Sequence, residues 1–319
     1  MKAPRLLLPL LLSFTVGAIL RAADPAHRVT SDVAYLPTVR VEKLDLYVPV
    51  QRAAGALSPA VVWVHGGGWM RGDKAEGSAK EICATLAEAG YVTASINYRI
   101  GASAWPQNVR DVKSAIRFLR AHAAEYGIDP ERIGVGGASA GAHLAMMAAF
   151  TPTRTEFDPP RHVVRPDEAV SQAVRCVINL YGPTALATRE AVDAQGKPLG
   201  KHRPPANSME AFGAGQSYDG GSVEAFIAAS PVTYVDRTSP PVLILQGTLD
   251  SEVDPGQPKT LAAVLTQYGV PHEMMFVEGA GHGFDLESWR GQPLSKDLRP
   301  TVFAFLAKHL GRVSVPQKP

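Results

Sequence analysis

The sequence predicts an α/β fold in which a mostly parallel, doubly wound sheet carries helices on both faces. Three observations support this prediction. Short apolar runs suited to buried strands alternate with longer segments of helical periodicity, and most of the connections between them are short. No internal repeat and no linker divides the 319 residues into two cores. We therefore expect one large domain.

The strand pattern begins with an alternating segment at 41–48, which we expect to pair antiparallel with 29–36. The runs that follow are apolar throughout, which is typical of strands buried on both faces of a parallel sheet. These runs lie at 60–64, 91–97, 132–136, 174–181, 241–246 and 272–277. They predict the centre of the sheet.

Helical periodicity fills the intervals between these strands. The clearest helices are expected at 74–89 and 107–126, and others at 140–150, 256–268 and 295–310. In the second helix one face is apolar at i, i+3 and i+4 spacing, and it consists of Val109, Val112, Ile116, Leu119 and Ala123. We expect that face to pack on the sheet.

The N-terminal segment has the pattern of a signal peptide. Lys2 and Arg5 precede an apolar run from Leu6 to Leu20, and small residues follow at Ala22 and Ala23. The run is short for a membrane span, although a retained N-terminal anchor is the alternative. We therefore expect a leader at 1–23, a domain at 24–319, and a secreted or periplasmic protein without stable membrane insertion after cleavage.

Charge gives no sign of a nucleic-acid partner. The formal net charge of +2 includes three bases and no acid from the expected leader, so 29 bases face 30 acids in the rest of the chain. A mature chain this close to neutral has no overall attraction for phosphate backbones or anionic membranes. The sequence does not predict an oligomeric state.

Two cysteines are too few for a disulfide framework. Cys83 falls in an expected helix and Cys176 in an expected strand. Export would permit a disulfide between them, but buried free thiols are the interpretation we favour, because cysteine often serves as a small core residue. No metal-binding cluster is apparent, and we expect no metal or organic cofactor.

A nucleophile pattern follows the expected strand at 132–136. Residues 137–141 read Gly-Ala-Ser-Ala-Gly and lead into the helix at 140–150. A serine between glycines at a sharp strand-to-helix turn is typical of a nucleophile elbow, which exposes the hydroxyl beside a helix N-terminus. The alternative is a glycine-rich turn with a structural serine. We predict Ser139 as the nucleophile.

A glycine-rich loop follows the expected strand at 60–64. Residues 65–69 read His-Gly-Gly-Gly-Trp, and preorganised main-chain N–H groups are the donors that stabilise the oxyanion of acyl transfer. We expect these donors from Gly67 and Gly68, together with Ala140. A phosphate loop is disfavoured because neither GK[ST] nor GxGxxG follows. We expect His65 to brace the loop by hydrogen bonds.

The remaining members of a triad are sought at the ends of the last two strands. His282 lies in a glycine-flanked loop after 272–277, and we prefer it as the base over His143 and His309, which lie in expected helices. Asp250 is the first carboxylate after 241–246, with Glu252 and Asp254 as alternatives. A serine, an acid and a histidine in this order along the chain are typical of α/β-hydrolases.

These motifs together resemble the α/β-hydrolase carboxylesterases and lipases with an HGGG oxyanion loop, in particular the secreted bacterial feruloyl-esterase-like and acetyl-xylan-esterase-like branch. The segments that carry the resemblance span most of the chain. They are LDLYVP at 44–49, VVWVHGGGWMRGDK at 61–74, INYR at 96–99, WPQNVRDVKSAIRFLR at 105–120, GIDPERIGVGGASAGAHLA at 127–145, SPVTYV at 230–235, PPVLILQGTLDSEVDPGQ at 240–257 and GAGHGF at 279–284.

The resemblance implies the α/β-hydrolase fold and assigns the same triad and oxyanion donors. Two departures stand near the acid: Gln246 occupies a position where relatives commonly have histidine, and Asp254 one where they commonly have proline. The second places an extra carboxylate near Asp250, where it could compete for His282.

Segment 183–221 is rich in Gly, Pro, Ala and Lys with weak periodicity, and we read it as a cap-like insertion or a surface excursion. Three aromatic residues are candidates for substrate binding or, alternatively, for packing beneath the loops: Trp69, Trp105 and Tyr181.

The expected function is that of a secreted serine carboxylesterase acting on short acyl or aryl esters. Small esters and acylated plant polysaccharides, with acetyl or feruloyl groups, are the expected substrates by resemblance. The alternatives are a peptidase or formamidase-like amidase on the same fold, and an inactive binding scaffold.

Overall fold

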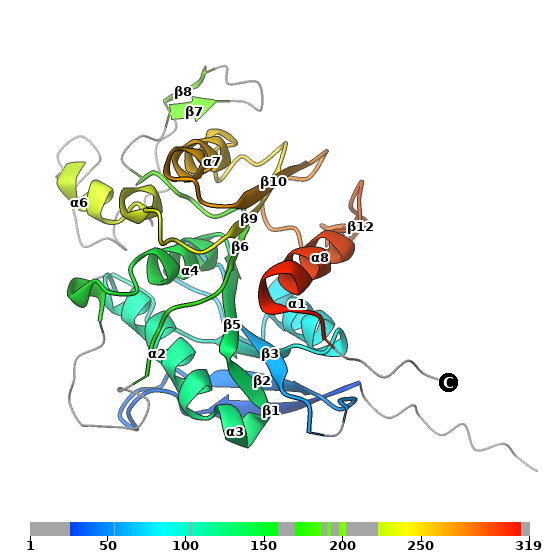
Figure 1. Cartoon of the computed structure of the whole chain (residues 1–319). Coiled ribbons are helices and arrows are strands. Elements are labelled where there is room, and N and C mark those ends of the chain that lie inside the picture. The colour runs from blue at the N-terminus through cyan, green and yellow to red at the C-terminus, as the bar shows by residue number, and fades with distance from the viewer. Residues whose placement is uncertain are drawn as a thin grey trace, which may run out of the picture.

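The computed structural model describes residues 26–53, 55–102, 104–158, 170–186, 190–192, 198–201 and 223–313. Its centre is an eight-stranded sheet in the order β1-β2-β4-β3-β5-β6-β9-β10 (Figure 1). The strands are β1 (His27–Val33), β2 (Leu44–Pro49), β3 (Ser58–Val64), β4 (Val92–Ile96), β5 (Ile128–Ala138), β6 (Val177–Leu180), β9 (Val242–Gly247) and β10 (His272–Val277). The expected leader at 1–23 and most of the expected insertion at 183–221 lie outside the described residues.

The sheet is antiparallel only at its N-terminal edge. β1 pairs antiparallel with β2, and β2 pairs antiparallel with β4. All other pairs are parallel. Strands β3, β4 and β9 are buried at every position, which is what their continuous apolar sequences require. The prediction of a mostly parallel sheet with an antiparallel start is confirmed.

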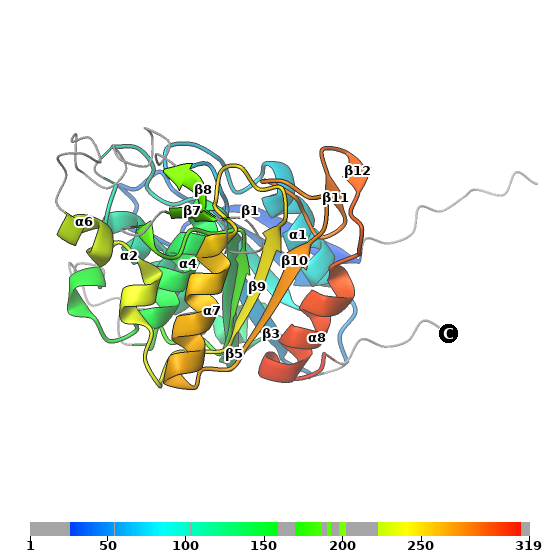
Figure 2. The same cartoon turned by 90° about the horizontal axis from the view of Figure 1, so that it is seen from above.

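Two helical layers cover the sheet (Figure 2). α1 (Gly77–Glu88) and α8 (Arg299–Leu310) lie on one face. α2 (Gln107–Ala121), α4 (Ala140–Phe150) and α7 (Gly256–Tyr268) lie on the other. Each layer packs its own apolar cluster against the shared sheet.

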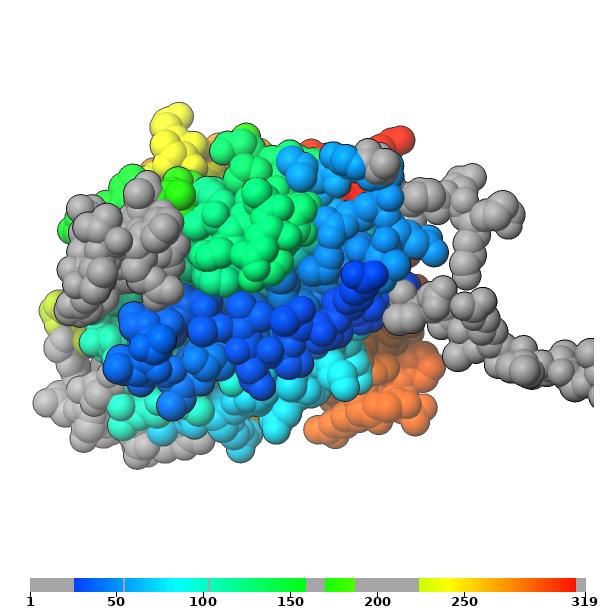
Figure 3. Space-filling view, turned by 90° about the horizontal axis from the view of Figure 1, so that it is seen from below, coloured from blue at the N-terminus to red at the C-terminus, as the bar shows by residue number. Residues whose placement is uncertain are grey.

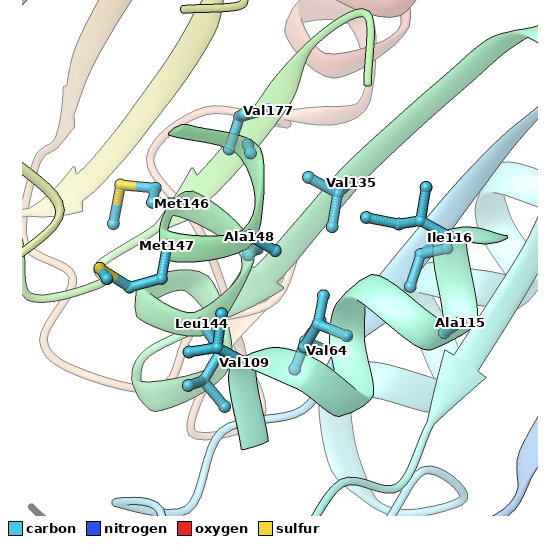
Figure 4. Packing of buried hydrophobic residues seen from close by; sticks show 14 of the residues in the cluster. Val64, Val109, Ala115, Ile116, Val135, Leu144, Met146, Met147, Ala148 and Val177 are labelled. Carbon is cyan, nitrogen blue, oxygen red and sulfur yellow. The ribbon is translucent and has the colours of Figure 1, made fainter. Parts of the chain in front are cut away.

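The apolar cluster between the sheet and helices α2 and α4 supports the elements that carry the site. Every residue of α4 is buried, so this helix is enclosed between the sheet and its neighbours. Figure 4 shows Leu144 and Met147 of α4 beside Val109 of α2, with the valines of β3, β5 and β6 behind them. The five residues predicted to form one face at 107–126 are all buried.

Several boundaries differ from the sequence prediction. The helix expected at 107–126 breaks at His122 into α2 and the short α3 (Ala123–Tyr126), which ends at Gly127 with a φ of 65°. Short elements without a clear pattern were not predicted: α6 (Val223–Ala228), β7 (Glu190–Val192), β8 (Pro198–Lys201), the hairpin β11 (Ser288–Trp289) and β12 (Gln292–Pro293), and two 3-10 turns, η1 (Thr155–Phe157) and η4 (Pro231–Tyr234).

Strand β1 forms one edge of the sheet and lies on the surface. Five of its seven residues are exposed, and the N-terminal blue segment spreads over this side of the molecule in Figure 3. Arg28 and Asp32 lie on this strand, and charges on an edge strand discourage pairing with another sheet.

Both cysteines are buried free thiols, as we favoured from the sequence. Burial raises the pKa of each thiol to about 12, so neither is a reactive thiolate. Within the described ranges, no helix is long and apolar enough to cross a membrane.

Candidate active site

Ser139 lies at the sharp turn between β5 and α4. Its backbone has φ 53° and ψ −122°, a conformation that costs a non-glycine residue on the order of 1–3 kcal/mol. The turn brings α4 so close to β3 that a Cβ at position 141 would lie 2.1 Å from the carbonyl oxygen of Val64. Only glycine fits there, and the predicted nucleophile elbow is therefore present.

His282 connects the serine to a carboxylate. Its Nε2 lies 2.9 Å from the Ser139 Oγ, and its Nδ1 lies 2.9 Å from the Asp250 Oδ2. A carboxylate can only accept, so Nδ1 carries the proton and Nε2 is free to accept from the serine hydroxyl. The structure thus brings together the three residues predicted from strand ends far apart in the sequence.

Asp250 is buried, and its carboxylate accepts four hydrogen bonds. The main-chain N–H groups of Glu252 and Val253 donate to Oδ1 at 2.9 Å each. Oδ2 accepts from His282 and, at 2.8 Å, from the Nε2 of Gln246. These donors offset the cost of burying the charge and fix the plane of the carboxylate.

Asp254 does not take the place of Asp250. Its Oδ1 accepts from the N–H of Gly256 at 2.7 Å, at the first turn of α7. There it satisfies a helix N–H group that has no partner within the helix. The anticipated competition between the two carboxylates for His282 is not seen, because Nδ1 is bonded to Asp250.

Two aromatic residues hold the loop that carries the histidine. The indole N–H of Trp289 donates to the carbonyl oxygen of His282 at 3.0 Å, and the Tyr181 hydroxyl donates to that of Phe284 at 2.7 Å. The Tyr181 ring also stands edge-on to the imidazole, with 4.8 Å between centroids. Trp289 was not predicted, because nothing in the local sequence marks the hairpin that carries it.

The glycine loop has the left-handed backbone that an oxyanion loop requires. φ is 118° at Gly67, 62° at Gly68 and 62° at Trp69. A Cβ at position 67 would lie 2.1 Å from the carbonyl oxygen of Arg71, so the loop closes on itself only with glycine. Ala140 is the first residue of α4, and its N–H has no acceptor within the helix.

His65 braces this loop, as expected. Its Nδ1 lies 2.6 Å from the carbonyl oxygen of Gly66, and its ring stacks on Tyr98 at 4.4 Å between centroids. The Tyr98 hydroxyl donates to the carbonyl oxygen of His65. Burial lowers the pKa of His65, so the ring stays neutral and structural.

His143 supports the same loop from α4 and does not face the serine. Its Nε2 donates to the carbonyl oxygen of Ala229 at 2.7 Å, and its Nδ1 accepts from the indole N–H of Trp69 at 3.2 Å. Complete burial lowers the pKa of His143 to about 4. The sequence placed this ring beside the elbow but gave no sign of its two partners.

A cavity of about 700 Å³ opens over the serine. Its walls include Ser139, His282, the three glycines of the loop, Trp69 and Tyr181, together with residues that were not predicted: Met70, Arg71, Leu249, Glu252, Trp289 and Arg290. Trp105 does not line this cavity. Its ring lies beside those of His143 and Phe157, which agrees with the packing alternative, and a substrate contact at Trp105 stays a prediction.

Among the described residues, no group of three His, Cys, Asp or Glu side chains is arranged to hold a metal ion.

Comparisons with known proteins agree with this geometry. The profile of the BD-FAE family matches residues 44–265, well over half of the chain. The chain is 30% identical to LipM, named a probable carboxylic ester hydrolase, and 32% identical to esterase LipQ, both from Mycobacterium tuberculosis. The matches cover 82% and 81% of this chain but only 57% and 58% of those proteins, so the chain spans little more than half of their length.

Solved structures show the same architecture. Est2, a thermophilic esterase from the Planctomycetes species Thermogutta terrifontis, is 26% identical, with a TM-score of 0.69 and coverage of 92% of this chain and 96% of Est2. The same enzyme has been solved with butyrate bound and phosphonylated by sarin. A truncated carbohydrate esterase from gut microbiota shares the fold at 24% identity, with a TM-score of 0.72 and coverage of 91% and 98%.

The overall fold is thus shared with these solved structures. The chain belongs to the BD-FAE family and has the α/β-hydrolase fold.

Proposed function

We propose that this chain is a serine carboxylesterase that cleaves short acyl or aryl esters through an acyl-enzyme. The observation that carries the proposal is the continuous path from the Ser139 Oγ through His282 to Asp250, with 2.9 Å at each step. The esterase names of the relatives support it. So does the neighbouring enzyme that was solved with butyrate, a short acyl product.

In the proposed reaction, the Ser139 Oγ attacks the ester carbonyl carbon while the His282 Nε2 takes its proton. The oxyanion is stabilised by main-chain N–H groups of Gly67, Gly68 and Ala140, which face it without reorganising. His282 then returns the proton to the departing alkoxide. A water molecule repeats the sequence on the acyl-enzyme, with His282 again as base, and the acid leaves.

Removal of the nucleophile tests this proposal. Ser139→Ala should lower kcat for 4-nitrophenyl acetate by at least roughly 10⁴-fold, since only the oxyanion donors and substrate binding would remain. The wild-type chain should also be labelled covalently by a fluorophosphonate, and the variant should not. Full activity in Ser139→Ala would contradict the mechanism, and an unlabelled, inactive wild type would favour a binding scaffold.

The natural substrate is proposed from the family resemblance. Acetyl and feruloyl esters of plant polysaccharides fit an open cavity with aromatic walls at Trp69, Tyr181 and Trp289. A panel of acetylated xylan, methyl ferulate and 4-nitrophenyl esters of increasing chain length would rank the candidates. Matched esters and amides would test the amidase alternative, for which turnover of the amide should dominate.

Export is proposed from the N-terminal sequence, with cleavage after Ala23. Expression of the full chain in a bacterial host, followed by mass spectrometry of the exported fraction, should find Asp24 as the first residue. Retention of the whole chain in the membrane fraction would instead support the alternative of an N-terminal anchor.

A further inference from the structure

We propose that Gln246 is a positioning residue that holds the Asp250 carboxylate toward His282. Gln246 lies on β9, is 1% exposed, and donates from Nε2 to the Asp250 Oδ2 at 2.8 Å. The same oxygen accepts the His282 Nδ1–H. Gln246 is thus the one side chain besides His282 that donates to this carboxylate among the described residues. The inference rests on the proposed triad.

The orientation of the amide follows from its partners. Its Nε2 lies 3.1 Å from the carbonyl oxygen of Val253 as well as 2.8 Å from Asp250. Both partners can only accept, so the NH₂ end of the side chain must face them. Val253 returns an N–H to the Asp250 Oδ1. The Gln246 side chain therefore links the two ends of the turn after β9 and holds the Asp250 carboxylate between them.

This contact also sets how much negative charge Asp250 presents to the histidine. A hydrogen bond to a carboxylate spreads and stabilises its charge, so a carboxylate with one donor fewer attracts a protonated imidazole more strongly. The other ionisable groups around His282 are Tyr181 beside the ring, Asp285 in the same loop, and Glu252, Arg71 and Arg290 on the cavity wall.

Gln246→Met tests the role, because it keeps the volume and removes the donor. We expect kcat/KM to fall roughly 10- to 100-fold through misplacement of the base. In the pH profile of kcat/KM, the acid limb is the range at low pH where activity falls as the base is protonated. The midpoint of this limb should shift to a higher pH by about half a unit to one unit.

Gln257→Met is the matched control. Gln257 is a buried glutamine on α7 that bonds Thr184 and Ala185 and does not contact the triad. Its variant should lose stability without moving the acid limb. A Gln246→Met profile with an unmoved limb, whatever its thermal stability, would overturn the positioning role. If the proposed function were wrong, Ser139→Ala would remain active. An inactive Ser139→Ala together with an unmoved acid limb in Gln246→Met would therefore contradict only the positioning role.

Two exposed arginines, Arg71 and Arg290, line the cavity. Neither forms an ion pair with an acidic side chain among the described residues. Arg71 follows the oxyanion loop, and its main-chain N–H donates to the carbonyl oxygen of Gly67 at 3.2 Å. Arg290 lies at the tip of the β11–β12 hairpin, with its guanidinium 4.7 Å from the ring centroid of Trp289. Each is thus carried by a segment that holds part of the catalytic machinery.

Arg290 occupies this position against its backbone preference. Arg290 and Gly291 form the two-residue turn of the hairpin, with φ of 51° and 74°. A turn with positive φ at both positions favours asparagine or glycine at the first, so arginine is there at some cost in stability. We infer that the cavity accepts esters bearing a negatively charged group, and that Arg290 and Arg71 bind this group. The inference deepens the proposed function and rests on it.

Pairs of esters of similar shape, one anionic and one neutral, test this inference. For an anion on the alcohol side, 4-acetoxybenzoate is compared with its neutral methyl ester. For an anion on the acyl side, mono-4-nitrophenyl glutarate is compared with 4-nitrophenyl butyrate. In at least one pair the wild type should favour the anion, and the preference in kcat/KM should fall roughly 10-fold in the Arg71→Gln, Arg290→Gln double variant and shrink as salt is raised.

Arg290→Asn separates recognition from structure. Asparagine suits the turn, so this variant should be at least as stable as the wild type while losing part of the preference for the anion. Arg237→Gln, at an exposed arginine outside the cavity, should leave the preference intact. An equal ratio of anionic to neutral turnover in the wild type and the double variant would overturn the inference, even with Ser139-dependent activity on neutral esters in place.

Discussion

At the scale of single residues, His143 has the most demanding environment near the site. It is completely buried and bonded on both ring nitrogens, to Trp69 on one side and Ala229 on the other. A protonated ring could not accept from the Trp69 indole, so the contact exists only with neutral imidazole. His143 therefore links the stability of the oxyanion loop to pH.

The sign of this dependence follows from the lowered pKa. Between about pH 4 and the ordinary value of 6.5, the unfolded chain binds a proton at His143 that the folded chain does not. The stabilisation is complete above 6.5 and is lost as the pH falls through this window, by on the order of 3 kcal/mol in total. Urea unfolding of the wild type at pH 7 and pH 4.5 should show this decrease.

His143→Gln should be less stable than the wild type at pH 7 and should have a shallower decrease in the free energy of unfolding between pH 7 and pH 4.5. His309→Gln is the control. His309 lies partly exposed on α8, and burial lowers its pKa as well, but it does not contact His143 or Trp69, so the dependence that comes from His143 should persist in this variant. An identical slope in His143→Gln and the wild type would refute the assignment.

Residues of this kind mark the limit of what the sequence could predict at the site. Ser139, Asp250 and His282 were predicted because each follows a strand within a recognisable motif. His143 bonds Ala229, a partner 86 residues away that it meets only in the folded chain. Gln246 lies only four residues before Asp250, but no sequence motif indicates that its amide turns toward that carboxylate. For Trp105 both substrate binding and packing were left open, because the sequence alone does not tell which neighbours its ring contacts.

At the scale of elements, the hairpin β11–β12 supports the histidine loop. Trp289 donates its indole N–H to the carbonyl oxygen of His282, and a Cβ at position 281 would lie 2.4 Å from the Trp289 ring. The hairpin therefore packs directly under the turn that aims the base. Its strands have two residues each, too short for a period-2 pattern, so the hairpin could not be predicted from the sequence.

Trp289→Phe should loosen this support while keeping an aromatic face for Arg290. We expect kcat/KM to fall several-fold, since the imidazole would sample more orientations, and the free energy of unfolding to fall by about 1 kcal/mol for the lost hydrogen bond. Tyr234→Phe removes a hydroxyl donor to the carbonyl oxygen of Ala228, away from the site, and should leave kcat/KM unchanged. Equal kinetics for Trp289→Phe and the wild type would count against the role of the hairpin.

The long elements were well predicted because their patterns repeat over several turns or are buried on both sides. The helix at 256–268 was predicted to the residue, and the strands β3, β4, β5, β6, β9 and β10 within a few residues. The break at His122 was missed because 107–126 keeps its apolar periodicity through Ala123, so composition alone gives no end signal before Gly127.

At the scale of the whole molecule, two apolar clusters share one sheet. Ile116 of α2 packs on one face and Phe305 of α8 on the other, and both side chains are buried. Since β2, β3, β5, β6 and β9 contribute side chains to both clusters, neither cluster can be lost without exposing the sheet to water on that side. We expect the described domain to unfold as one cooperative unit.

Ile116→Ala should therefore lower the free energy of unfolding by about 2–5 kcal/mol, and Phe305→Ala by about 3–5 kcal/mol. In each variant, far-ultraviolet circular dichroism and tryptophan fluorescence should report the same urea midpoint. Val39→Ala, at a side chain that is 88% exposed, should change stability by less than about 0.5 kcal/mol. Two separated midpoints in either core variant would show that the clusters unfold independently.

The turn at Arg290 and Gly291 has a further consequence for which residues selection would favour at position 290. A library of residues at position 290, sorted only for resistance to heat or protease, should become enriched in asparagine and glycine, because these residues relieve the backbone. The same library sorted on turnover of a charged ester should retain arginine. Selection for stability and selection for turnover of the charged ester would then favour different residues at position 290. Neither selection should replace the neighbouring Trp289.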